Sequence, residues 1–287
     1  MWIAYALASA LFAGSMSVLA KIGVKNTDST LATALRTVVV VIFAWLMVFI
    51  VGSAKDIATI SLKSIVFLIL SGLATGGSWL CYFKALQIGD VNKVVPVDKS
   101  STVLTMILSF FLLGEGLTWF KAAAMVLIGI GTYLTIERKA NDSEGEKGYK
   151  WLVYALLSAL FASLTAILGK VGIVGVESNL GVAIRTVVVL IMAWVIVLLQ
   201  GKQHNIRNID KRSWLFIGLS GLATGLSWMC FYRALQDGPV SVVVPIDKLS
   251  ILVTVVFSYF VLHERLSKKF FIGLSLIVAG TLSLVFL

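Results

Sequence analysis

Long apolar stretches alternate with short polar breaks along the whole of this 287-residue chain. Each stretch holds about 20 residues, which is the length of an α-helix that crosses the hydrocarbon core of a bilayer. The stretches are continuously apolar and about twice as long as a membrane β-strand, so helices are favoured over a barrel. The pattern predicts ten transmembrane helices, over residues 2–20, 31–51, 64–83, 93–113, 117–136, 151–169, 180–200, 213–232, 242–262 and 268–286.

The composition agrees with a bilayer as the solvent. Hydrophobic residues make up 59% of the chain and charged residues 13%, and the mean hydropathy is +0.99, which is typical of an integral membrane protein. The first apolar stretch lacks the basic start of a secretory signal, and an equivalent stretch begins at Trp151. We therefore expect the first stretch to remain as a transmembrane helix.

The chain is a tandem duplication. A shift of 149 positions places the second half on the first without a gap, so that Arg36 coincides with Arg185 and Asp98 with Asp247. Because each half holds five spans, the second half is expected to enter the bilayer upside down relative to the first. The expected fold is an all-α membrane protein with ten transmembrane helices in two inverted five-helix repeats. The repeats are expected at 1–138 and 150–287, with a charged linker at 139–149.

Basic residues gather on one side of this path. The connections after odd-numbered spans, with the neighbouring helix ends, hold 17 of the 24 Lys and Arg residues, against 7 on the side of the termini. Without the eight duplicated basic residues in or at the ends of spans, the counts are 13 and 3. The positive-inside rule then predicts a cytoplasmic linker and extracytoplasmic termini in a plasma (inner) membrane. The loops account for the net charge of +10, so no nucleic-acid partner is expected.

The sequence gives little support for an enzyme. Cys81 and Cys230 lie inside apolar spans, and His204 and His263 lie in or beside loops, without the spacing of a zinc site. No GxxxxGK[ST] phosphate-binding loop is present. We expect no catalytic residues, no metal and no cofactor.

Polar side chains inside the spans form four stripes. In the fourth span, and again in the ninth, the spacing i, i+3, i+7 keeps a carboxylate and two hydroxyls on one helix face. We expect the stripes to line a shared cavity in which aromatic rings stack on an organic substrate or cation. The alternatives are that Ser and Thr bond to nearby carbonyls or neighbouring helices and that the aromatics only pack. The residues are Ser71, Thr75, Ser78, Trp79 and Tyr82; Asp98, Ser101 and Thr105; Ser220, Thr224, Ser227 and Trp228; and Asp247, Ser250 and Thr254.

Charged residues inside the spans are candidates for substrate binding or ion coupling, because a charge at mid-bilayer costs about 2.5 to 3.5 kcal/mol. Arg36 and Asp98 each lie about 8 to 10 Å inside their spans from the same side, where an ion pair between them is possible. For Lys21, Lys84 and Arg36 the alternative is extension to the lipid headgroups. The candidate set is Arg36, Asp98, Lys99, Arg185, Asp247 and Lys248.

Further residues shape the helices rather than bind. Pro96 and Pro245 precede the two aspartates and predict kinks beside the cavity, because proline removes a helical hydrogen bond. Glu115 and Glu264 end the fourth and ninth spans and are expected to be interfacial caps. Small-residue pairs predict close helix packing at Gly72, Gly76, Gly221 and Gly225.

With these motifs the chain resembles the EamA-type carriers of the drug/metabolite transporter superfamily along almost its whole length. The resemblance rests on the third spans (SGLATGGSWLCYFKAL and SGLATGLSWMCFYRAL), the V-x-P-[VI]-D-K run after them, and the Glu that closes the fourth spans (LLGE and VLHE). It implies alternating access around a central cavity lined chiefly by spans 3, 4, 8 and 9. Many relatives are drawn with both termini in the cytosol, whereas the loop charges here favour the opposite.

The expected function is secondary transport of a small organic solute, such as an amino acid, a metabolite or an amphiphilic drug-like compound. Export is the direction that the resemblance implies. Expected partners are that solute and the lipid bilayer, with a monomer as the default and a homodimer as the alternative. Two other functions stay open: a flippase for a lipid-linked headgroup, and a non-transporting membrane scaffold or receptor.

Overall fold

The computed structural model describes residues 1–23, 27–88, 91–135, 150–262 and 267–285. Within these ranges the chain is entirely helical, which confirms the predicted all-α class. The first half holds α1 (Trp2–Gly23), α2 (Ser29–Val51), η1 (Ser53–Thr59), α3 (Leu62–Ile88), α4 (Val91–Lys99), α5 (Ser101–Leu113) and α6 (Trp119–Leu134). The second half holds α7 (Lys150–Gly172), α8 (Ser178–Leu199), η2 (Lys202–Asn208), α9 (Lys211–Asp237), α10 (Val240–Lys248), α11 (Ser250–Leu262) and α12 (Lys268–Val285).

Most of these helices have the length of a membrane span. Among the described residues, eight helical stretches are long and apolar enough to cross a bilayer, and α6, with 16 residues, is a shorter apolar helix. Many large apolar side chains on their outer faces are exposed, as in Phe49, Phe111 and Leu199, because lipid takes the place of a protein core there. The protein is therefore a multi-pass membrane protein, and the number of ten spans stays a prediction.

The predicted fourth and ninth spans each consist of two helices that meet at a tightened turn. At these junctions Ser100 N–H donates to Val97 O (3.2 Å) and Leu249 N–H donates to Ile246 O (2.9 Å), an i to i−3 pattern. Each junction lies four residues after a proline, at position 96 or 245. The backbone of Ser100 and Leu249 stays in the right-handed helical region, so the helical hand is kept through each junction.

The two halves pack into each other rather than side by side. The most extensive contacts are α3 with α7 and α1 with α9, and each of these pairs joins one helix from each half. The 149-residue shift converts the one pair into the other. The same exchange relates α5·α7 to α1·α11 and α4·α7 to α1·α10, while α2·α8 and α6·α12 exchange with themselves.

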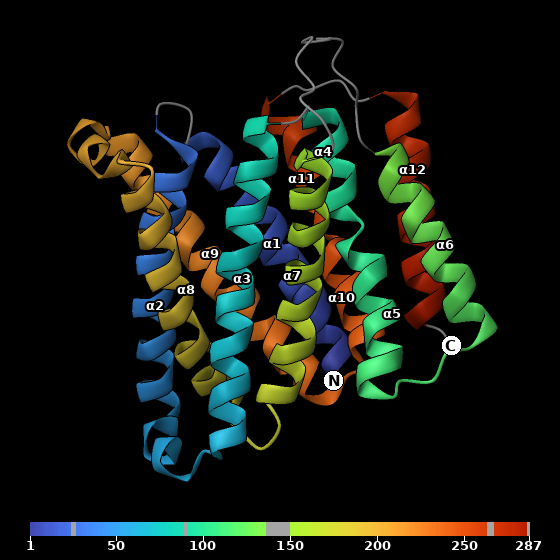
Figure 1. Ribbon diagram of the computed structural model, residues 1–287, viewed down its shortest axis with the longest axis horizontal. Coiled ribbons are helices and arrows are strands. Elements are labelled where there is room, and N and C mark those ends of the chain that lie inside the picture. The colour runs from blue at the N-terminus through green and yellow to red at the C-terminus, as the bar shows by residue number, and fades with distance from the viewer. Residues whose placement is uncertain (24–26, 89–90, 136–149, 263–266, 286–287) are drawn as a thin grey trace.

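Figure 1 shows the outcome of this packing. Helices α2 and α8 lie at one edge of the molecule, α6 and α12 at the other, and α1, α3, α7, α9 and α10 lie between them. The equivalent elements η1 (blue) and η2 (gold) lie at opposite ends of the bundle.

Glycines allow the closest of these helix contacts. A Cβ on Gly72 in α3 would lie 2.7 Å from Cβ of Val188 in α8, and a Cβ on Gly221 in α9 would lie 2.7 Å from Cβ of Val39 in α2. Both distances are shorter than van der Waals contact, so these positions have no room for a side chain. The expectation of close helix packing at these glycines is confirmed.

We therefore expect Gly72→Ala and Gly221→Ala to destabilise the protein by about 1–3 kcal/mol through overpacking. The measurement is thermal unfolding of the purified variants in detergent. Gly218→Ala is the matched control, because it lies in the same helix as Gly221 and a Cβ there would meet nothing within 4 Å. Equal unfolding temperatures for all three variants would contradict the assignment.

Candidate functional site

Two hydrogen-bond clusters, related by the duplication, surround Asp98 and Asp247. The Asp98 carboxylate in α4 accepts a hydrogen bond from the Ser158 hydroxyl of α7 (2.6 Å). The Ser78 hydroxyl of α3 donates to the Ser158 carbonyl (3.1 Å), and the two hydroxyls lie 3.3 Å apart. Both serines are buried. Asp98 is therefore held by a serine from the other half of the chain.

The second cluster repeats the first with the halves exchanged. Asp247 in α10 accepts from the Ser9 hydroxyl of α1 (2.6 Å), and the Ser227 hydroxyl of α9 donates to the Ser9 carbonyl (3.1 Å). Ser9 and Ser158 are not among the residues predicted to line a cavity. They could have been found from the sequence, because they are duplicated serines, 149 positions apart, in the middle of apolar spans.

Arg185 of α8 occupies a seat built from hydroxyls and aromatic rings. Its Nε donates to the Ser71 hydroxyl (3.1 Å) and its Nη2 donates to the Thr75 hydroxyl (2.7 Å). Its guanidinium carbon lies 4.8 Å from the ring centroid of Trp228 and 5.2 Å from that of Tyr232. The side chain is only 3% exposed, and its Nη1 has no hydrogen-bond partner. A buried guanidinium is thus held in place without a counter-ion at Nη1.

Arg36, the duplicate of Arg185, has a different environment. It is partly exposed, and its Nη1 contacts the sulfur of Met16 (3.3 Å). Among the described residues no ion pair joins Arg36 to Asp98. The two aspartates are therefore held by serine hydroxyls rather than by the arginines.

A central cavity of about 340 Å³ brings many of the expected residues together. Three cations and one carboxylate border it: Lys99, Arg185, Lys248 and Asp247. Its remaining lining includes Met16 and Thr165 from α1 and α7, which the sequence analysis did not single out, and the expected residues Thr224, Ser227, Trp228 and Ser250.

Other expected residues lie elsewhere. Several hydroxyls bond to a carbonyl of their own helix, as the alternative interpretation proposed: Thr105 to Ser101, Ser220 to Ile217 and Thr254 to Ser250. Trp79 packs beside the apolar cluster around Leu31, and Tyr82 packs beside Ala85. Pro245 is buried within α10, whereas the side chain of Pro96 and the whole of Glu264 lie outside the described residues.

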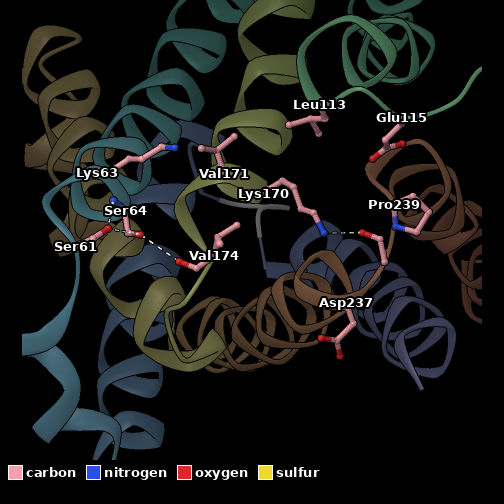
Figure 2. A pocket seen from close by; sticks show the side chains of 11 residues that line it. Ser61, Lys63, Ser64, Leu113, Glu115, Lys170, Val171, Val174, Asp237 and Pro239 are labelled. Carbon is pink, nitrogen blue, oxygen red and sulfur yellow. Dashed lines mark hydrogen bonds between the residues drawn. The ribbon is translucent and has the colours of Figure 1, made fainter.

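A second cavity, of about 520 Å³, opens near the junction of α9 and α10 (Figure 2). There Lys170 donates to carbonyl oxygens at the end of α9, those of Leu235, Gln236 (3.3 Å) and Gly238 (2.9 Å). The Glu115 carboxylate accepts from the Val240 and Ser241 N–H groups that begin α10 (2.6 and 2.9 Å).

This clamp, formed by Lys170 and Glu115, places charges of the favourable sign at the two helix ends. Glu115 acts as a cap, as expected, although it caps α10 rather than its own helix. In the part of the chain that the structure describes, no group of three or more His, Cys, Asp and Glu residues is arranged to hold a metal.

Duplicated apolar helices that enclose a small charged cavity define the class of this protein, which is a multi-pass membrane transporter. The comparison of the sequence with protein families agrees. Residues 1–137 and 149–286 each match the EamA-like transporter family, and the chain belongs to that family.

Two individual comparisons fit this assignment. The chain is 44% identical over 134 residues to a Sinorhizobium sp. protein described as "Uncharacterized transporter in cobO 3'region". The match covers 95% of that relative but 47% of this chain, so the relative corresponds to about one half of the duplication. A solved structure titled "Crystal structure of protein" matches 99% of this chain and 96% of its own, with a TM-score of 0.79 and 16% identity, and shares the fold.

The serine–aspartate bonds give a testable prediction. We expect Ser9→Ala and Ser158→Ala each to destabilise the protein by about 1–3 kcal/mol, because a hydrogen bond to a charged, partly buried carboxylate is lost. Thermal unfolding in detergent measures the effect. Ser275→Ala is the control, since the exposed Ser275 hydroxyl bonds only to a carbonyl of its own helix. If Ser9→Ala is no more destabilising than this control, the bond to Asp247 contributes nothing.

Proposed function

We propose that this protein is a secondary transporter that exports a small organic solute by alternating access around the central cavity. The observation that carries the proposal is the set of unpaired charges inside an apolar bundle. Such charges are costly in a membrane and usually mark a substrate or ion pathway. The family assignment supports transport in general, and the solute, direction and mechanism are the finer parts of the proposal.

The proposal includes ten spans and two inverted repeats. The exchange of helix contacts between halves supports a twofold relation. The position of η1 and η2 at opposite ends of the bundle supports an inversion of one half relative to the other. Transporters of this kind place the solute site at the interface of the repeats, where the central cavity lies.

A difference between the repeats supports alternating access. Arg185 is seated on Ser71 and Thr75, but Arg36 is not seated on the equivalent Ser220 and Thr224. Inverted repeats exchange their conformations when the cavity changes sides. We assign the structure, in which Arg185 bonds to Ser71 and Thr75 and the Lys170–Glu115 clamp is formed, to one of these two states. In the other state Arg36 bonds to Ser220 and Thr224, and Arg185 leaves Ser71 and Thr75.

The two aspartates are assigned to coupling or to recognition of the solute's charge. Asp247 borders the cavity and Asp98 does not, so in this state Asp247 is the carboxylate that is accessible from the cavity. Each carboxylate accepts one serine hydroxyl and keeps further acceptor capacity for a proton or a cationic group. The location proposed is the plasma membrane, with a cytoplasmic linker, extracytoplasmic termini and a monomer as the working unit.

The first test does not require the solute to be known. Bacterial cells that express the protein are expected to release at least one small organic solute in excess of cells that express Asp98→Asn/Asp247→Asn. Mass spectrometry of the medium measures it, with equal amounts of protein in the membrane. The control variant is Asp56→Asn, a carboxylate in η1 away from the cavity. Transport is contradicted if the medium is the same for all three proteins.

The clamp gives a second test of alternating access. Glu115→Ala removes two charge-assisted hydrogen bonds at the start of α10, so we expect the end of the bundle held by the clamp to open more often. The expected increase in the rate of cysteine labelling is at least about tenfold. A cysteine at Thr165 in the central cavity, in a Cys81→Ala/Cys230→Ala background, reports access to a membrane-impermeant maleimide from the clamp side. Lys63→Ala is the control, because Lys63 borders the same outer cavity and is not a residue of the clamp. An unchanged labelling rate in Glu115→Ala would show that the clamp does not close this mouth.

A further inference from the structure

We propose that the transported solute is a small organic oxyanion, a carboxylate or a phosphate ester, with a flat apolar body. The oxyanion binds in the central cavity, whose wall includes Arg185, Lys99 and Lys248, and the apolar body lies against Trp228 and Phe231 of the same wall. The inference rests on the proposed function, since it assigns the chemistry of that transporter's solute.

The charge balance of the cavity is the first argument. Lys99, Arg185 and Lys248 contribute three positive charges to its wall and Asp247 contributes one negative charge. In the described part of the chain none of the three cations has an ion-pair partner within 4.0 Å, and neither ammonium has a hydrogen-bond partner. Lys99 and Lys248 are exposed and Arg185 is buried, so the charge of the guanidinium is the least screened of the three. A bound anion therefore gains attraction from all three cations, whereas a cationic solute meets a net repulsion.

The seat of Arg185 is the second argument. Its partners Ser71 and Thr75 are neutral hydroxyls, and its Nη1 remains unpartnered although the side chain is 97% buried, as its 3% exposure implies. A buried charge without a counter-ion is costly. The two hydroxyls fix the guanidinium in one orientation and leave Nη1 for an acceptor. A planar guanidinium in a fixed orientation is well suited to bind carboxylate or phosphate oxygens.

The wall and the size of the cavity restrict the rest of the solute. Trp228, Phe231 and Tyr232 border the cavity, and the rings of Trp228 and Tyr232 lie beside the Arg185 guanidinium. A flat apolar body packs against these rings. The volume of about 340 Å³ lies at the small end of ligand sites, which are roughly 300–1,000 Å³. The site therefore fits a solute of metabolite size rather than a large amphiphile.

A series of probes that differ only in charge tests the proposal on the wild-type protein. Phenylacetate, phenylacetamide and phenethylamine share one aromatic body and carry a negative, neutral and positive group. We expect phenylacetate to raise the unfolding temperature of the detergent-purified protein, with a Kd at least about tenfold lower than that of the other two. Phenyl phosphate distinguishes a phosphate from a carboxylate. Equal binding of phenethylamine or phenylacetamide, or no effect of either oxyanion at millimolar concentration, would overturn the proposal.

Variants locate the oxyanion in the site. Arg185→Gln is expected to weaken the oxyanion at least about tenfold, because a hydrogen bond between charged groups is lost. Arg212→Gln is the matched control, since Arg212 also stacks on an aromatic ring, that of Phe216, but lies outside the cavity. Lys99→Gln provides an independent test if Arg185→Gln does not fold, because Lys99 makes no ion pair or side-chain hydrogen bond with the described residues. Unchanged oxyanion binding in Lys99→Gln and in a folded Arg185→Gln would refute the site.

The outcomes separate this inference from the proposed function. If the medium experiment identifies a cationic or neutral solute, the oxyanion proposal is wrong but the protein remains a transporter. If no solute is released, the transport function itself is contradicted. Release of an organic anion by the wild-type protein, and its loss in Lys99→Gln, would support both.

Discussion

Charged groups inside an apolar bundle need polar partners, and in this protein Asp98, Asp247 and Arg185 each have partners in the opposite half of the chain. Ser158 donates to Asp98, Ser9 donates to Asp247, and Ser71 accepts from Arg185. Without these bonds each buried charge would carry its full desolvation cost. The same serines also join α3 to α7 and α9 to α1, which are the helix pairs with the most extensive contacts.

The two halves differ in the surroundings of their duplicated arginines. Arg36 and Arg185 are duplicates, but only the seat of Arg185 has extra hydroxyls: the Tyr232 hydroxyl lies 3.2 Å from that of Ser71, and the Thr165 hydroxyl lies 3.3 Å from that of Thr75. The duplicates of Tyr232 and Thr165 are Phe83 and Met16, which have no hydroxyl. These two differences therefore bias the equilibrium between the two proposed states toward the one in which Arg185 is seated.

The ends of the helices matter as much as their faces. Where α9 ends and α10 begins, free carbonyl and N–H groups are satisfied by Lys170 and by Glu115, which come from α7 and from the loop after α5. These charges match the partial charges of the helix ends. Through Glu115, a residue of the first half that bonds to the start of α10, the contact ties both halves together.

The sequence by itself determined the all-helical membrane class, the duplication and the family, because bilayer thickness fixes the length of apolar segments and a repeated chain repeats its pattern. It also indicated Asp247, Arg185, Lys99 and Lys248 as site residues, because charges are rare in apolar spans, and all four border the central cavity. Only the tertiary structure decided which residues meet. Ser9 and Ser158 bond to the aspartates, and Ser71 and Thr75 bond to Arg185. Hydrogen bonds form only at about 3 Å. The spacing of residues along the sequence does not show which helices pack against each other, so it could not predict these partners.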